Sequence, residues 1–222
     1  MQQSPPSPLD INDKSDKMND SPTTTETSLD DGAEALLTPV EARVLGCLME
    51  KQRTTPEQYP LTLNALVTAC NQKSARQPVM KLEPGEVGHT VAELRDRGLI
   101  HASFTGRTER YDHKIAGHFM LDRRQQAVLC TLMLRGPQTV GELRTNTARL
   151  ADFDDLAAMQ STLDELAQHS PPLVRELPRQ AGMREQRFAH LLCGEPKLDA
   201  AAAPGTSRVG SHQAAAGVEA RL

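Results

Sequence analysis

The sequence predicts a mainly helical α+β protein made of two winged helices in tandem, each with three helices followed by a two-stranded ribbon. Three observations predict this fold. A capped amphipathic helix begins near residue 38 and again near residue 122, and the apolar positions after the two caps match at an offset of 84. The second helices and the last strands match at an offset of 77, and the third helices at 72. Unequal offsets indicate loops of different length in a duplicated unit.

The first repeat begins at Thr38-Pro39-Val40-Glu41, which is typical of a capping box with proline at the first helical position. Leu63, Leu66, Val67 and Cys70 recur with helical spacing and predict the second helix. The elements expected here are helices over about 39–52, 62–71 and 85–97, then alternating strands from Ile100 to Phe104 and from Tyr111 to Ile115, joined by a turn at 105–109.

The second repeat begins at Asp122-Arg123-Arg124-Gln125, the counterpart of the first capping box. Thr139 and Glu142 have the spacing of a further capping box, after Gly136-Pro137 ends the preceding helix. The elements expected here are helices over about 122–134 and 154–169, with the capped helix at Thr139 between them, a strand over 173–177, a turn at 180–184 and a returning strand over 185–192.

Charge and composition divide the chain into four parts. Residues 1–35 carry eight acids and two lysines with few apolar side chains, so we expect an acidic, disordered leader. Residues 36–118 and 119–195 form the two winged helices, and 196–222 an Ala/Gly-rich disordered tail. The first winged helix is the only mildly basic part, with eleven basic and nine acidic residues over 36–118.

Several classes of protein are disfavoured by what the sequence lacks. Apolar runs reach only about six residues, far short of the roughly 20 that span a bilayer, and the N-terminus does not resemble a signal peptide. We therefore expect a cytoplasmic protein. The four cysteines include no C-x-x-C pair, so free thiols are expected rather than a zinc site. No phosphate-binding loop, nucleophile elbow or metalloprotease motif is present, so no enzyme activity, catalytic residue, metal, cofactor or small-molecule ligand is expected.

A DNA-binding winged helix places its third helix in the major groove and its ribbon on the backbone. In the first repeat, cationic, hydroxyl and imidazole side chains occur before and on the third helix, and arginines occur in the ribbon. The candidates for contact with duplex DNA are Lys73, Ser74, Arg76, His89, Thr90, Arg107 and Arg110. The alternative for the loop residues is capping of local backbone, and for the arginines simple solvation of an exposed ribbon.

The third helix of the second repeat has the opposite character. Between residues 152 and 168 there are five acids and no basic residue, so this helix would be repelled by phosphate. Helix capping is the simpler explanation for Asp152, Asp154 and Asp155. Candidates for contact with a protein partner are Asp154, Asp155, Asp164 and Glu165.

The stretch LTPVEARVLGCLMEKQRTTPEQYPLTLNALVTACNQKSARQP over residues 37–78 resembles the YceH-like family of bacterial proteins. The segments GELRT at 141–145 and REQRFAHLLCGE at 184–195 resemble later motifs of that family. The resemblance covers about residues 36–195 and implies a tandem winged-helix fold without an assigned activity. The acidic leader is outside the family core, and many members continue into a coiled coil after a segment like 217–222, where this sequence stops.

Two functions remain open from the sequence. The favoured one is a non-enzymatic regulatory protein that binds duplex DNA through residues 36–118. The alternative is a protein–protein adaptor, like the tandem winged helices that serve chromosome segregation. The fold favours the first and the acidic second repeat favours the alternative, while the oligomeric state is left open.

Overall fold

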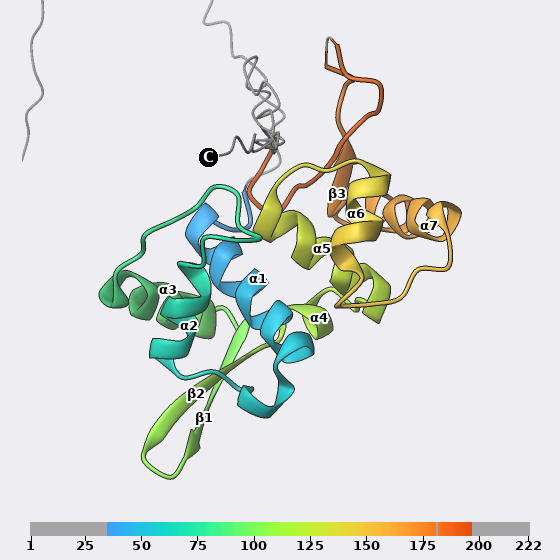
Figure 1. Ribbon diagram of the computed structural model, residues 1–222. Coiled ribbons are helices and arrows are strands. Elements are labelled where there is room, and N and C mark those ends of the chain that lie inside the picture. The colour runs from blue at the N-terminus through green and yellow to red at the C-terminus, as the bar shows by residue number, and fades with distance from the viewer. Residues whose placement is uncertain (1–34, 181, 197–222) are drawn as a thin grey trace, which may run out of the picture. The chain divides into compact units, whose positions relative to one another are not determined.

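The computed structural model describes residues 35–180 and 182–196, and within them the protein is mainly helical with two small antiparallel sheets (Figure 1). The predicted leader and tail lie outside the described residues, apart from Ala35 and Pro196. In chain order the elements are α1 (Pro39–Thr54), the short 3-10 helix η1 (Pro56–Gln58), α2 (Leu63–Cys70), α3 (Pro84–Asp96), β1 (Ile100–Thr105), β2 (Thr108–His113), α4 (Ile115–His118), α5 (Arg123–Arg135), α6 (Val140–Thr147), α7 (Leu156–Ala167), β3 (Val174–Glu176) and β4 (Phe188–His190).

The helices begin where the capping residues predict. The Thr38 hydroxyl accepts from the Glu41 backbone N–H at 3.2 Å, and the Glu41 carboxylate accepts from the Thr38 N–H at 2.7 Å. The boxes at the starts of α5 and α6 are formed in the same reciprocal way. Each box satisfies two backbone donors that the helix itself leaves without a partner. Local sequence therefore fixes the start of three helices before any tertiary contact is considered.

The predicted apolar stripes lie in the interior. Val44, Leu45 and Leu48 of α1 have no exposed surface, and their counterparts in α5 are equally buried. The buried apolar residues form one cluster that includes members of both repeats. The four cysteines are free, as expected. Within residues 35–180 and 182–196 no helix is long and apolar enough to cross a membrane.

The two ribbons differ in length. β1 and β2 pair along six residues each, from Ile100 opposite His113 to Thr105 opposite Thr108. Gly106 has φ +64°, which suits the first position of a two-residue hairpin turn. β3 and β4 pair over only three residues each, shorter than the predicted strands. The first ribbon therefore projects as a long hairpin, which Figure 1 shows extending away from the helices.

One predicted strand ends early. The sequence pattern extended the second strand of the first repeat to Ile115, but β2 ends at His113 and Ile115 begins α4. β1 starts at Ile100, which pairs with His113, so residues after His113 have no partner within β1. The Lys114 N–H donates to the carbonyl of Leu99, which precedes β1, at 2.8 Å. The chain then turns, and α4 buries Ile115 completely.

The matching helices α1 and α5 pack against each other, and Figure 1 shows them between the other helices of the two repeats. The Cys130 thiol donates to the Gly46 carbonyl at 3.4 Å. These two residues are separated by the repeat offset of 84, so equivalent positions of the two helices meet. A Cβ atom on Gly46 would lie 2.9 Å from Leu134 Cδ2, closer than van der Waals contact permits. Gly46 therefore allows the close approach of α1 to α5.

Candidate functional site

The loop between α2 and α3 is held in place by three polar side chains. The Asn71 amide accepts from the Leu82 N–H at 2.7 Å and donates to the Leu82 carbonyl at 2.8 Å. The buried Arg43 donates to the carbonyls of Cys70 and Pro78 at 3.1 and 2.6 Å. These bonds fix both ends of the loop and leave Lys73 exposed between them. The neighbouring Ser74, also a predicted contact residue, is exposed as well.

Arg76 is the third of these side chains, and its position corrects the sequence interpretation. Its guanidinium is wholly buried and donates two hydrogen bonds to the Glu50 carboxylate, at 3.1 and 2.6 Å. It also donates to Gln72 and to the Ala69 carbonyl. A side chain with its donors occupied inside the protein does not offer them to phosphate. Arg76 is therefore a structural residue and not a DNA contact.

Glu50 depends on this partner for its charge. Burial alone would raise the pKa of the Glu50 carboxyl, but the hydrogen bonds and positive charge of Arg76 outweigh it, with a smaller contribution from Lys51. The net result is a lowered pKa, so Glu50 stays ionised. The pair joins α1 to the loop after α2 across 26 positions of sequence.

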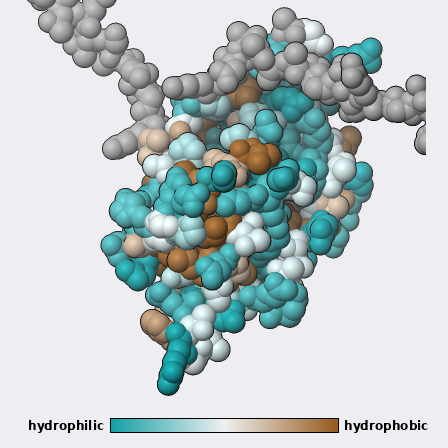
Figure 2. All heavy atoms as spheres, turned by 60° about the vertical axis from the view of Figure 1, so that its left-hand side comes forward, coloured by the Kyte–Doolittle hydropathy of each residue, from teal (hydrophilic) through white to brown (hydrophobic). Residues whose placement is uncertain are grey.

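The candidates on α3 are less available than the sequence suggested. Thr90 is buried, and its hydroxyl donates to the Glu86 carbonyl at 2.9 Å, so Thr90 is corrected from a DNA contact to a core residue. His89 is exposed, but its Nε2 lies 3.3 Å from the Glu93 carboxylate. Figure 2, which turns this side of the molecule forward, shows mostly hydrophilic side chains around a few apolar ones. The acids exposed along and just before α3 are Glu83, Glu86, Glu93 and Asp96.

The cations near α3 are matched by acids. Arg95 lies 3.7 Å from Asp96 and 3.8 Å from Glu109. Arg97 donates to Glu41 at 2.7 Å and also to the Leu36 carbonyl. The solvent side of α3 therefore carries excess negative charge.

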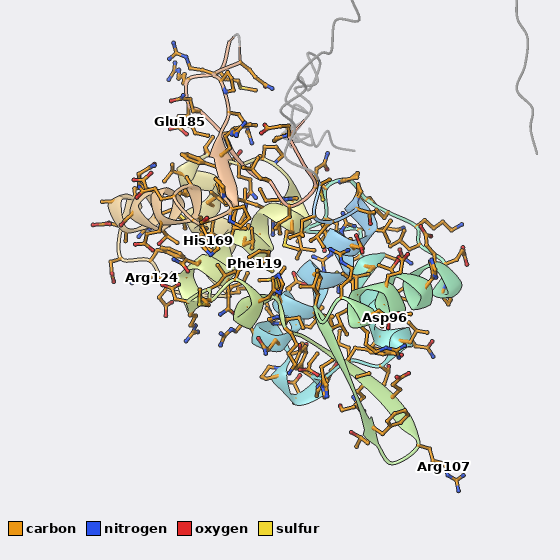
Figure 3. All side chains as sticks on the ribbon, turned by 180° about the vertical axis from the view of Figure 1, so that it is seen from behind. Asp96, Arg107, Phe119, Arg124, His169 and Glu185 are labelled. Atoms are coloured by element: carbon orange, nitrogen blue, oxygen red, sulfur yellow. The ribbon has the colours of Figure 1, made fainter. Side chains whose placement is uncertain are left out.

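The two arginines of the first ribbon have different roles. Arg107 is exposed at the hairpin tip and points away from the protein (Figure 3). Arg110 instead donates to the Pro60 carbonyl at 2.9 Å, beside a backbone pairing between Leu61 and Tyr111. Arg110 thus links the ribbon to the segment that leads into α2, and its contact with DNA stays a prediction.

The second repeat has the same link at the offset of 77. Arg187 donates to the Pro137 carbonyl at 2.8 Å, beside a backbone pairing between Gln138 and Phe188. It also forms a two-bonded pair with Glu142, at 2.8 and 3.0 Å. The sequence contained the signal for this role, because a residue that recurs at the same position in both repeats is accounted for by the shared fold.

Buried histidines recur in the same way. His113 Nε2 lies 3.0 Å from the Gln52 side-chain oxygen, and its backbone N–H donates to the Tyr59 hydroxyl at 2.9 Å. Burial lowers the pKa of His113 to about 4, despite the opposing charge of Asp112. Burial also lowers the pKa of His190, its counterpart in β4, to about 4. Both rings are therefore neutral in the folded protein at physiological pH.

The acidic candidates of the second repeat lie on its surface. Asp155 caps α7 by accepting from the Ala158 N–H at 2.8 Å, so the capping role expected for it is present. Asp164 and Glu165 are exposed, and among the described residues their side chains accept hydrogen bonds only from neutral side chains.

Asp154 has a cationic neighbour that the local sequence does not reveal. Arg124 of α5, which is labelled in Figure 3, donates to Asp154 at 3.0 Å and also lies over the Phe153 ring. Arg124 therefore offsets part of the negative charge of the loop before α7. Within the part of the chain that the structure describes, the negative charge of Asp164 and Glu165 on α7 itself is not offset in this way.

Cations from both repeats meet on one surface, and of these the sequence interpretation named Lys73 alone as a contact candidate. Lys51, Lys73 and Arg149 line one open hollow beside the C-terminal end of α1. Arg53 and Arg123 line a smaller hollow next to it. These residues come from four separate segments, so only the tertiary structure brings them together. No group of three or more acidic, histidine or cysteine side chains suited to a metal ion occurs in the described ranges.

A family model described as a protein of unknown function, DUF480, matches residues 37–183. The chain belongs to this family. A UPF0502 protein from Geobacter sulfurreducens is 54% identical to this chain over 168 residues, which cover 75% of this chain and 77% of the relative. A UPF0502 protein from Cellvibrio japonicus is 49% identical over 175 residues, covering 79% and 80%. Another, from Vibrio atlanticus, is 45% identical over 183 residues, covering 79% and 84%.

These matches confirm the resemblance to a bacterial family without an assigned function. The matched residues 37–183 contain every contact candidate predicted from the DUF480 sequence.

Proposed function

We propose that the protein is a protein–protein adaptor with two winged helices, whose third helices α3 and α7 present acidic faces to a partner. Two features support the winged-helix topology. Three helices followed by two strands occur twice in the same order, as α1, α2, α3, β1, β2 and as α5, α6, α7, β3, β4. In each repeat a backbone pairing before the second helix, at Leu61 and at Gln138, adds a third short segment to the ribbon.

The charge of the third helices carries this proposal. In a DNA-binding winged helix this element enters the major groove, where the phosphates require positive charge. The exposed acids of α3 outnumber its one cation, Arg95, which is already matched by Asp96 and Glu109. On α7 the acids Asp164 and Glu165 have no cationic partner among the described residues. Both helices would therefore be repelled by a duplex.

The surface of α7 has a further property that suits a protein partner. Leu156, its first residue, keeps 53% of its surface exposed beside the capping acid Asp155. An apolar side chain next to charged ones is the composition of a protein interface, where a buried apolar anchor is surrounded by a polar rim. We therefore infer that the partner offers an apolar site bordered by basic residues.

Duplex DNA binding by α3 and the first ribbon, which the sequence favoured, has less support. Arg76 and Thr90 are buried, Arg110 is occupied and His89 is paired with Glu93. On the third helix and ribbon, the candidate that stays exposed and unpaired is Arg107. One arginine at a hairpin tip gives little affinity for a duplex when the adjoining helix is acidic.

The test is site-specific photo-crosslinking in cells of the source bacterium. A photoreactive amino acid replaces Ser161, an exposed residue on α7, or Arg107 at the hairpin tip. The adaptor proposal predicts a protease-sensitive adduct of defined mass at Ser161. That adduct should disappear when Asp164→Lys and Glu165→Lys are combined, and persist with Glu57→Lys, a matched reversal on exposed η1. A nuclease-sensitive adduct at either position, or none at Ser161, would contradict the proposal.

A further inference from the structure

We propose that the basic surface formed by Lys51, Arg53, Lys73, Arg123 and Arg149 binds the phosphate backbone of duplex nucleic acid. The surface lies at the junction of the two repeats. An open hollow of about 480 Å³ is lined by the end of α1 with Lys51, the α2–α3 loop with Lys73, and Arg149. A smaller hollow beside it is lined by Arg53 and Arg123. Consecutive residues line the two hollows, Arg149 the larger and Leu150 the smaller, and Arg123 donates to the carbonyl of Leu150.

The charge of this surface is not balanced by its own acids. Within the described ranges, Lys73, Arg149, Arg53 and Arg123 form no ion pair. Lys51 lies 3.2 Å from Glu50, the one acid that lines the hollows. Glu50 is also bound at 2.6 Å by the buried Arg76, so one positive charge already balances it from inside. The five surface cations are left in excess, and binding of a polyanion would relieve their mutual repulsion.

The chemistry of the larger hollow favours phosphate over an acidic protein. Apart from Ala75, its lining residues are polar or charged. Tight protein partners derive most of their binding energy from buried apolar or aromatic anchors, which this hollow does not provide. Phosphate is instead held by charge and by hydroxyl donors such as Ser74, which is exposed here.

The same lining distinguishes between forms of nucleic acid. No aromatic side chain lines either hollow, so unpaired bases would have nothing on which to stack. Contact with the backbone of a duplex requires no such stacking. The surface is therefore expected to bind duplex with little dependence on base sequence, because phosphate contacts carry no sequence information directly.

The repeat explains why one surface draws on both halves. Lys73 and Arg149 lie in corresponding loops, since residue 72 matches residue 149 at the offset of 77. Packing of α1 on α5 brings these two loops to the same hollow. This surface is distinct from the solvent faces of α3 and α7. It thus adds a nucleic-acid contact to an adaptor and does not depend on the partner proposed above.

The test measures fluorescence anisotropy of a labelled, mixed-sequence duplex of about 20 base pairs with the full-length protein, from about 50 to about 200 mM salt. Lys73→Ala and Arg149→Ala are suitable variants because both side chains are exposed, so folding should be retained. Each lost phosphate contact should flatten the log–log salt slope by about one unit and weaken binding about tenfold at about 50 mM salt. Lys81→Ala, an exposed lysine outside the hollows, should leave both quantities unchanged.

Three results would overturn this inference. They are an absence of duplex binding at about 50 mM salt, an unchanged slope in both variants, and a slope that flattens with Arg107→Ala instead. A labelled acidic peptide is measured in parallel. If the peptide binds through Lys73 and Arg149 while the duplex does not, the surface serves an acidic protein and the inference fails. The α7 reversals Asp164→Lys and Glu165→Lys should not weaken duplex binding, so this result is separate from the adaptor test.

Discussion

Replacing Arg76 with alanine should lower the free energy of unfolding of the first repeat. The substitution should not act through nucleic-acid binding. The side chain has no exposed surface and makes five hydrogen bonds. Two go to the Glu50 carboxylate, one to Gln72, and one each to the Ala69 and Ala75 carbonyls. Its removal leaves the Ala69 and Ala75 carbonyls without this donor, and leaves the mostly buried Glu50 carboxylate with Lys51 as its neighbouring cation.

The expected cost follows from the burial of this pair. Breaking a buried ion pair by removing one partner costs about 3–5 kcal/mol, since the other charge stays in the interior. The Glu50 side chain is 17% exposed, so water can partly solvate it and the lower end, about 3 kcal/mol, applies. Because whole domains are stable by only about 5–15 kcal/mol, Arg76→Ala should lose a large fraction of the total.

The assay is urea denaturation of the full chain followed by circular dichroism. Arg76→Ala and Glu50→Ala should each lower the free energy of unfolding, and Arg76→Met combined with Glu50→Leu should cost less than the two single losses together. As a matched control, Lys73→Ala, from the same loop but exposed, should change stability by less than about 0.5 kcal/mol. If Arg76→Ala keeps wild-type stability but weakens duplex binding, the structural role assigned to Arg76 is wrong.

The Arg76–Glu50 pair also predicts how the stability of the protein changes with pH. The folded pKa of Glu50 is lowered, so its contribution is complete above the unfolded value of about 4.5 and is lost as pH falls through the folded value. Glu50→Gln should reduce the acid sensitivity of the remaining stability. Repeating the urea series between neutral pH and about pH 3 measures this difference.

Three further predictions concern other contacts. The pKa of His113 is lowered from 6.5 to about 4, so the folded protein favours the neutral ring. Stability should therefore fall by up to about 3 kcal/mol as pH drops from about 6.5 to about 4. His113→Gln should make this fall smaller, as measured by urea denaturation at each pH. Gly46→Leu should lower stability by about 1–3 kcal/mol because it forces α1 from α5, measured as a lower Tm. Arg187→Lys should lose the two-bonded pairing with Glu142 and lower the local stability of β4 by about 1 kcal/mol, measured as faster amide hydrogen exchange in that strand. If any one of these substitutions leaves its measured quantity unchanged, the contact on which that prediction depends is refuted.

The elements that the sequence predicted correctly depend on local interactions. Thr38, Asp122 and Thr139 cap their helices through bonds to residues three positions away, so the pattern and the structure coincide. The strand end at His113 depends instead on where β1 begins, which the alternation of side chains does not show. Boundaries set by a distant partner are the ones that a local pattern misplaces.

The internal position of Arg76 was missed for the same reason. Arg76 belongs to a loop rich in polar residues, where exposure is the usual outcome, and its partner Glu50 is 26 residues earlier. The basic surface was missed because Lys73 and Arg149 are far apart in the chain, and no short window of sequence contains both. Arg110 was different, since its recurrence as Arg187 already indicated a structural use.

The duplication offers a way to separate residues that maintain the fold from residues that serve a function. Arg110 and Arg187 make the same bond to a carbonyl before the second helix, so the shared fold accounts for both. Lys73 has no such counterpart at its own position, because the residue 77 positions later is the buried Leu150, and the cation of the corresponding loop, Arg149, stands one position earlier. A cation that only one repeat keeps at a given position, exposed and without an ion pair, is not explained by a requirement common to both repeats. This asymmetry supports assigning Lys73 to binding and Arg110 to the fold.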